Sequence, residues 1–155
     1  MFDKIIKEFS KLGYTISAME SCTGGGVSNE ITNCNDSSNI FKFGAVTYSN
    51  EFKIKMGVSE DIINKYSVYS RECASSMSKA ISLYTNSTYG IGITGKLNRI
   101  DKNNLYGEDN LVFISIYNSL NNSYKESSIK CIYNTRRKNK RLVILEIIKL
   151  LEEEI

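Results

Sequence analysis

The sequence of 155 residues contains no histidine, no proline and no tryptophan. The lack of histidine excludes Ser-His-Asp and Cys-His catalysis and histidine-ligated metals, so any general base must be a lysine, tyrosine, aspartate or glutamate. Without proline, turns depend on Gly, Asn, Asp and Ser. No CxxC pair occurs among the cysteines, which excludes a zinc knuckle and predicts reduced, mostly buried thiols at Cys22, Cys34, Cys73 and Cys131.

The chain also lacks any apolar run near the roughly 18 residues that a membrane span requires. Its first eight residues mix charges with apolar positions and have no signal-peptide core. With 41% hydrophobic and 24% charged residues, the composition is that of a globular domain. We therefore expect a single domain over residues 1–155, located in the cytoplasm and not bound to a membrane.

Helical and β-type patterns alternate along the chain. Apolar residues recur at helical spacing over 2–12, and Gly13 stands where a C-terminal cap is expected. Further patterns predict short helices opening at 49–51 and 59–61, longer helices over 71–85 and 137–153, and strands over 14–19, 41–48, 89–95, 110–117 and 124–133, the last two forming a hairpin. Because three connections are long enough for crossovers, we expect an α/β fold, a three-layer α/β/α sandwich with a mixed, mainly parallel sheet.

The segment Glu20-Ser21-Cys22-Thr23-Gly24-Gly25-Gly26 lies between the first predicted strand and a helical pattern. Glycines there let the backbone approach a ligand, and a helix start offers N–H groups to an anion or oxyanion. An ordinary turn capped by Ser or Thr is the structural alternative. Since ligands of such sheets lie beyond strand ends, we expect Ser21 and Thr23 to meet residues from two other strand ends, Tyr48, Ser49, Lys53, Thr94 and Gly95.

The net charge is +3, and its densest concentration is the basic run of residues 136–141. A nucleic-acid surface is one interpretation, but no aromatic interleaving or nucleic-acid motif accompanies the run, so we favour the solvated start of an amphipathic helix. Basic residues at a helix start oppose the macrodipole, as do Glu152, Glu153 and Glu154 at its end. This conflict suggests that at least one of the arginines is kept for a ligand.

Two motifs resemble the CinA C-terminal domain family, the nicotinamide-nucleotide amidohydrolases. The first is Ala18-Met19-Glu20-Ser21-Cys22-Thr23-Gly24-Gly25, and the second is Val46-Thr47-Tyr48-Ser49-Asn50-Glu51 followed by Lys53, with Asp36-Ser37-Ser38 between them. Their order and spacing are those of the family, and the resemblance covers about residues 5–95.

This resemblance implies deamidation of nicotinamide mononucleotide to nicotinic acid mononucleotide and ammonia, without metal or cofactor. It implies Ser21 as nucleophile and Lys53 as its base, a pair that replaces histidine if the lysine is desolvated. Backbone N–H groups near Thr23, Gly24 and Gly25 would form the oxyanion hole, and Tyr48 would orient the pair or relay a proton. Substrate contacts are implied for Glu20, Thr23, Gly24, Gly25, Ser38, Thr94, Gly95 and Arg136, with Arg136 on the phosphate and Lys140 where a second arginine is usual. A homodimer is also implied.

Each of these residues has a structural alternative: Glu20 and Ser38 as caps, Tyr48 as core, Lys53 as solvated. The chain also departs from the family after Thr94-Gly95, where an Ile-Ala-Gly-Pro segment and a Gly-rich loop are usual and residues 96–102 are charged and bulky. Lys96 or Arg99 would then replace a backbone contact, or the pocket would be altered. A catalytically inactive member that binds a nucleotide or a protein partner is therefore the alternative function.

Overall fold

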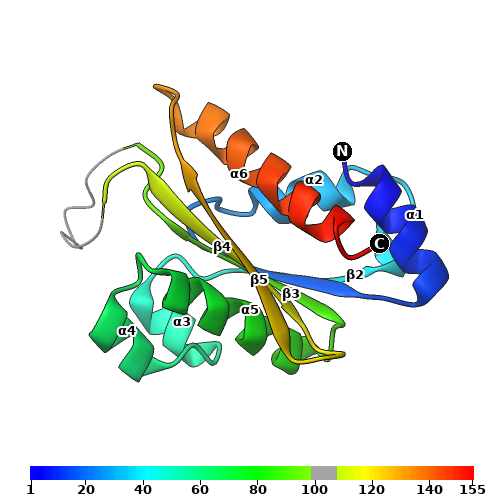
Figure 1. Cartoon of the computed structure of the whole chain (residues 1–155), viewed down its shortest axis with the longest axis horizontal. Helices are drawn as coiled ribbons and strands as arrows, with labels where there is room; N and C mark the ends of the chain where they lie inside the picture. Colours follow the sequence, from blue (N-terminus) through cyan, green and yellow to red (C-terminus); the bar gives the residue numbers. More distant parts are fainter. Residues whose placement is uncertain (99–107) are drawn as a thin grey trace.

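The computed structural model describes residues 1–98 and 108–155, which form helices on both faces of a five-stranded sheet (Figure 1). Along the chain the elements are α1 (Asp3–Leu12), β1 (Ile16–Glu20), α2 (Gly26–Thr32), the 3-10 helix η1 (Ser37–Asn39), β2 (Phe41–Val46), α3 (Asn50–Lys55), α4 (Glu60–Tyr66), α5 (Arg71–Thr85), β3 (Tyr89–Gly95), β4 (Leu111–Asn118), β5 (Ser123–Lys130) and α6 (Arg136–Glu152). This order confirms the expected α/β class.

The strand order is β2-β1-β3-β4-β5. β1 lies parallel to both β2 and β3, whereas β4 pairs antiparallel with β3 and with β5. Four strands therefore run in one direction and β4 runs against them, which agrees with a mixed, mainly parallel sheet. The hairpin of β4 and β5 is confirmed, and β3 has the predicted bounds.

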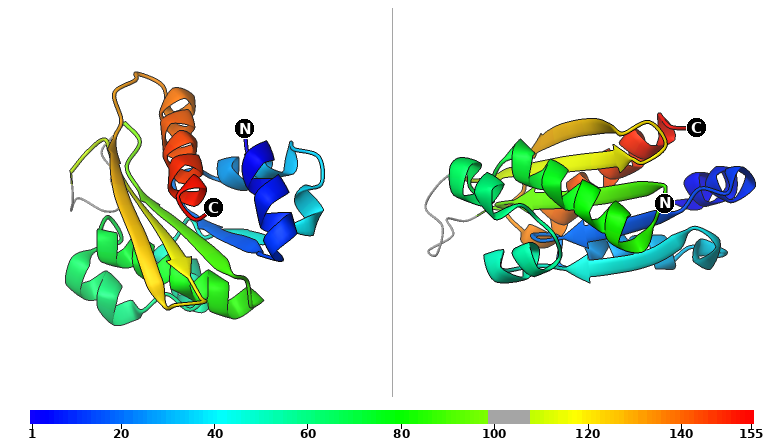
Figure 2. Two further views of the ribbon diagram at one scale, coloured as in Figure 1. Left: turned by 45° about the vertical axis from the view of Figure 1, so that its right-hand side comes forward. Right: turned by 90° about the horizontal axis from the view of Figure 1, so that it is seen from below.

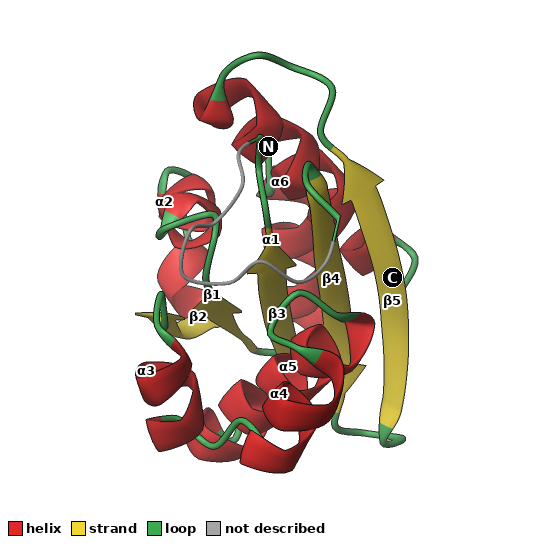
Figure 3. Cartoon of the chain, turned by 90° about the vertical axis from the view of Figure 1, so that its left-hand side faces the viewer, coloured by secondary structure: helices red, strands yellow, loops and turns green. Residues whose placement is uncertain are grey.

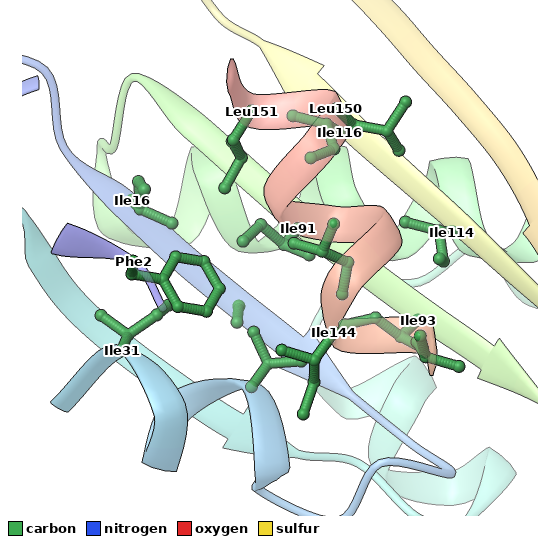
Figure 4. Close-up of a cluster of buried hydrophobic side chains, with 14 of the residues drawn as sticks. Phe2, Ile16, Ile31, Ile91, Ile93, Ile114, Ile116, Ile144, Leu150 and Leu151 are labelled. Atoms are coloured by element: carbon green, nitrogen blue, oxygen red, sulfur yellow. The ribbon is translucent and has the colours of Figure 1, made fainter. Parts of the chain in front are cut away.

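Helices α1, α2 and α6 cover one face of the sheet, and α3, α4 and α5 cover the other (Figure 2). The first face holds the larger apolar core, in which side chains such as Phe2, Ile91 and Ile144 pack together between the sheet and the helices of that face (Figure 4). On the other face, Met19 of β1 packs with Val68, Cys73, Met77 and Ile81. The predicted three layers are therefore present.

Two glycines of β3 let α5 lie close to the sheet. A Cβ atom at Gly90 would collide with the backbone of Ser78, and one at Gly92 with the backbone of Ala74. The prediction that these glycines permit close packing is confirmed. This close packing holds α5 against β3, and α5 also contacts β1.

The second strand is shorter than predicted. It ends at Val46, and the chain then leaves the sheet before α3 begins at Asn50. The Ser49 hydroxyl accepts a hydrogen bond from the Phe52 N–H, as a helix cap does. The helix that begins at this cap carries Lys53, whose ammonium contacts the carbonyl of Thr47, the first residue after β2.

Candidate active site

Ser21 and Lys53 meet at the end of the first strand. The Ser21 N–H donates to the Ile93 carbonyl of β3 over 3.1 Å, which fixes the residue just beyond the sheet. The Lys53 ammonium donates to Ser21 Oγ over 3.0 Å and to the Thr47 carbonyl over 2.7 Å. The structure thus brings together the two residues for which the resemblance implies nucleophile and base.

Lys53 is an unusual lysine because only 2% of its surface is exposed. Burial lowers the pKa of its ammonium, and the nearby thiols of Cys73 and Cys22 oppose this shift. Because its pKa is lowered, a larger fraction of Lys53 is neutral amine at a given pH, and the neutral amine is the form that can take a proton from a hydroxyl.

Cys22 is adjacent to Ser21 but does not have the character of a nucleophile. Burial raises the pKa of its thiol to about 12, and it raises the pKa of the Cys73 thiol to about 11. Both groups are therefore protonated near neutral pH, and a protonated thiol is a poor nucleophile. Of the Ser21 hydroxyl and the Cys22 and Cys73 thiols, the hydroxyl is the group that accepts a hydrogen bond from the Lys53 ammonium in the described part of the chain.

The glycine loop after Ser21 takes left-handed backbone conformations, with φ of 59° at Gly24 and 94° at Gly25. Its amides are not equivalent. The Gly24 N–H donates to the Ser21 carbonyl over 3.0 Å, so the predicted oxyanion contact from Gly24 is replaced by a turn. In the described part of the chain, the N–H groups of Thr23 and Gly25 donate no such bond and remain candidates.

The Glu20 side chain caps the start of α2 and points toward that helix. Its carboxylate accepts hydrogen bonds from the N–H groups of Val27 (2.9 Å) and Ser28 (3.0 Å) and from the Ser28 hydroxyl (2.7 Å). The N-cap residue of α2, Gly25, has no side chain to do this. The structure therefore gives Glu20 the capping role that was its structural alternative, and the substrate contact that the resemblance implies stays a prediction.

The hydroxyl of Thr94 and the backbone of Gly95 are likewise engaged. Thr94 Oγ1 donates to the Val68 carbonyl over 2.7 Å, which ties β3 to the segment before α5. A Cβ at Gly95 would meet the backbone of Leu111 and Val112, so this glycine serves packing against β4. Thr23 differs, because its buried Oγ1 has no hydrogen-bond partner among the described residues.

The start of α6 lies against the glycine loop. Lys140 Nζ is 3.3 Å from the position that a Cβ of Gly24 would occupy, and the Arg136 guanidinium donates to the Tyr48 hydroxyl over 3.4 Å. Tyr48 is 65% exposed, so it is not a core residue, and among the described residues its hydroxyl accepts a hydrogen bond from Arg136 rather than from Lys53. Two cations and a phenol thus border the exposed side of the loop.

Ser38 is the candidate that the structure separates from the others. It lies in η1, which precedes β2, whereas Ser21, Tyr48 and Lys53 follow the opposite ends of their strands. Across the six residues of β2 this separation is about 20 Å. The structure therefore does not bring Ser38 together with Ser21 and Lys53, and the substrate contact that the resemblance implies for Ser38 stays a prediction. Arg99 lies outside the described residues.

Two positioning residues were missed. The Thr47 carbonyl holds Lys53, a contact that residue type could not reveal. Asn139 is buried in α6, donates to the carbonyls of Leu97 and Tyr133 and accepts from the Tyr133 N–H. A polar residue at a core position of the helical pattern was the available signal for Asn139.

No cluster of three or more His, Cys, Asp or Glu side chains suited to a metal ion occurs within residues 1–98 and 108–155. In the same described residues, no helix has the length and apolar character needed to cross a membrane.

Comparison with known proteins identifies the family. The CinA C-terminal domain matches residues 1–154. The chain belongs to this family. A putative competence-damage inducible protein of Clostridium beijerinckii is 38% identical over 129 residues, 83% of this chain and 30% of that protein. One from Clostridium kluyveri is 45% identical over 84 residues, 54% of this chain and 20% of its own length. The chain thus spans a fifth to a third of the length of these curated relatives.

Solved structures of CinA-type proteins share the fold. Competence/damage inducible protein CihA from Agrobacterium tumefaciens superposes with a TM-score of 0.87 at 23% identity, covering 97% of this chain and 90% of that one. A CinA superfamily protein from Klebsiella pneumoniae gives 0.88 at 18% identity, covering 98% and 93%. At these identities the structural similarity shows the fold alone, so the chemistry has to be argued from the residues of the site.

Proposed function

We propose that this chain hydrolyses the carboxamide of nicotinamide mononucleotide to nicotinic acid mononucleotide and ammonia. The observation that carries the proposal is the 3.0 Å contact between Ser21 Oγ and the buried amine of Lys53. A serine hydroxyl needs a base to attack an amide, and this chain contains no histidine to serve as one.

In this mechanism the neutral Lys53 amine takes the Ser21 proton as Oγ bonds to the amide carbon. The carbonyl electrons move to the oxygen, where the N–H groups of Thr23 and Gly25 would stabilise the negative charge. When the C–N bond breaks, the Lys53 ammonium returns the proton to the leaving nitrogen, which departs as ammonia. Water then adds to the acyl-enzyme with Lys53 again as base, and Ser21 is released with the carboxylic acid product.

Recognition of the substrate's phosphate is assigned to Arg136 and Lys140. Both come from the first turns of α6 and border the glycine loop, so a phosphate there would meet two cations and the N–H groups of a helix start. A ligand in this position explains why basic residues occupy the end of α6 that opposes them electrostatically. We propose the cytoplasm as the location of the reaction, because the spacing of the four cysteines in the sequence predicts reduced thiols.

The test is ammonia release from nicotinamide mononucleotide by the purified protein. Ser21→Ala and Lys53→Met are each expected to abolish turnover. Lys55→Met is the matched control, because Lys55 lies on the same helix but is exposed and pairs with Glu51 over 2.7 Å. Undiminished turnover in the Ser21 and Lys53 variants would overturn the mechanism.

A nucleotide-binding module without turnover is the second candidate, favoured by Lys96. Its side chain is buried over the Tyr69 ring, 4.8 Å from the ring centroid, and 3.5 Å from the Asp109 carboxylate, at the strand end where the chain departs from its family. Calorimetric binding of amidated nucleotides without ammonia release from any of them would support this candidate over the hydrolase.

A further inference from the structure

Several buried polar atoms have no hydrogen-bond partner within residues 1–98 and 108–155. They are Ser17 Oγ, Thr23 Oγ1, Thr47 Oγ1 and Asn98 Oδ1. Buried polar groups almost always pair with protein or with ordered water, so each of these atoms requires a physical explanation. Thr47 stands out among them, because its own carbonyl accepts a hydrogen bond from the Lys53 ammonium.

Thr47 is held from two sides just beyond the end of β2. Its N–H donates to the Glu20 carbonyl over 2.8 Å, and its carbonyl accepts from Lys53 over 2.7 Å. Figure 3 shows β1 and β2 between α2 on one face and α3, the helix that carries Lys53, on the other. Thr47 and Lys53 are each only 2% exposed. The Thr47 hydroxyl therefore belongs to the residue that orients the base, in a place that bulk solvent does not reach.

The Lys53 nitrogen has a third hydrogen-bonding position. A lysine ammonium offers three N–H groups. In the described part of the chain, Lys53 donates two hydrogen bonds, one to Ser21 Oγ over 3.0 Å and one to the Thr47 carbonyl. If both are kept when the amine is neutral, the third position is the lone pair, which can accept a proton. A water molecule between this lone pair and the Thr47 hydroxyl would satisfy both groups.

We propose that Thr47 positions the water molecule that hydrolyses the acyl-enzyme, by holding it between the Thr47 hydroxyl and the Lys53 amine. The inference rests on the proposed function. This water donates one hydrogen to Thr47 Oγ1 and the other to the amine, which leaves a lone pair of its oxygen for the acyl carbon. That carbon is bonded to Ser21 Oγ, which lies 3.0 Å from the same amine in the free enzyme.

The hydrolytic step needs no further reactant. The water oxygen bonds to the acyl carbon as its proton passes to the Lys53 amine, and the carbonyl electrons move to the carbonyl oxygen. When these electrons return, the bond from carbon to Ser21 Oγ breaks, and the Lys53 ammonium gives the proton to Oγ. The products are the carboxylic acid and the free enzyme. Thr47 exchanges no proton in this step and is a positioning residue.

Competition between water and hydroxylamine tests this role. Hydroxylamine is a stronger nucleophile that needs less help from a base, and it converts the acyl-enzyme to a hydroxamate, whereas water gives the acid. Thr47→Val keeps the shape of the side chain without the hydroxyl, so the ratio of hydroxamate to acid should rise about tenfold over wild type. This ratio is set after acylation, so a loss of folded protein or slower acylation does not move it. An unchanged ratio would overturn the proposal.

Two variants serve as controls for the ratio. Thr47→Ser retains a hydroxyl and should keep the wild-type ratio. Ser17→Ala removes another buried hydroxyl that has no partner among the described residues, on β1, the strand that leads to Ser21, and it should also keep the ratio. An equal rise in Ser17→Ala and Thr47→Val would refute a specific role of Thr47.

A crystal structure of the wild-type protein tests the water site without reference to activity. A water within hydrogen-bond distance of both Thr47 Oγ1 and Lys53 Nζ is expected, and it should be lost in Thr47→Val. A Thr47 hydroxyl paired with a protein atom instead would refute the proposal. Failure of the wild-type protein to release ammonia would count against the proposed function and leave this water site standing.

Discussion

Glu20→Gln separates a structural role of Glu20 from a substrate contact. The carboxylate accepts three hydrogen bonds, one on Oε1 from Val27 and two on Oε2 from Ser28. A glutamine can place its carbonyl oxygen at only one of these positions. With that oxygen facing Ser28, its NH2 group faces the Val27 N–H, and two donors oppose each other. Since Val27 is fully buried, water cannot take the place of the lost acceptor.

One unsatisfied buried N–H costs about 1–3 kcal/mol. For a protein of this size each kcal/mol lowers Tm by about 2–4 °C, so Glu20→Gln is expected to lower Tm by roughly 2–12 °C. Differential scanning calorimetry measures the shift, with Glu30→Gln on the same helix as control. KM for the mononucleotide should stay unchanged at a temperature where the variant is folded. An unchanged Tm together with a raised KM would refute the capping role and restore the substrate contact.

Three further predictions concern the base, the phosphate contacts and the start of α6. The kcat/KM should rise with pH through a midpoint below the usual lysine pKa of 10.5, because burial lowers the pKa of Lys53 and only its neutral amine accepts a proton; a flat profile would contradict this. Arg136→Met and Lys140→Met should each raise KM for the mononucleotide about 10-fold but leave KM for the unphosphorylated nucleoside unchanged. Lys138→Met is the control, and an equal rise in KM for both substrates would exclude a phosphate contact. Asn139→Leu should lower the free energy of unfolding in urea by about 2–4 kcal/mol, since it leaves the buried Leu97 carbonyl and the partly buried N–H and carbonyl of Tyr133 without this partner. An unchanged midpoint would argue that water replaces the amide.

The sequence predicted the bounds of helices and strands better than it predicted contacts between side chains. Patterns of apolar residues and caps placed α5 and β3 at their observed bounds, because periodicity and turn chemistry are local. The pairing of Ser21 with Lys53 followed from the motifs and from the rule that ligands lie beyond strand ends. The capping contacts of Glu20 could not be predicted in this way, because a carboxylate in a motif can face a ligand or the next helix, and the sequence does not give the direction of the side chain.

Ser38 and Gly24 show the same limit. The motif spacing placed Ser38 with the site, but β2 carries the chain away from η1 to the opposite end of the sheet before the second motif begins. At Gly24, the turn uses the N–H group that was expected to face the substrate. Both outcomes depend on which partners compete for a group in three dimensions, and this competition is not encoded at any single position.

The hydrogen bond from Lys53 to the Thr47 carbonyl makes the contact between Lys53 and Ser21 depend on the edge strand β2, which ends one residue before Thr47. The Thr47 N–H donates to the Glu20 carbonyl over 2.8 Å, just beyond the end of β2. This hydrogen bond between the β1 and β2 segments therefore fixes the residue whose carbonyl orients Lys53. Edge strands open more readily than central ones. Each time the hydrogen bond from Thr47 to Glu20 breaks, the Lys53 amine would be released from its position beside Ser21. Amide hydrogen exchange at Thr47 therefore reports how long the pair stays assembled, and a ligand or a second chain that slows this exchange should lengthen that time.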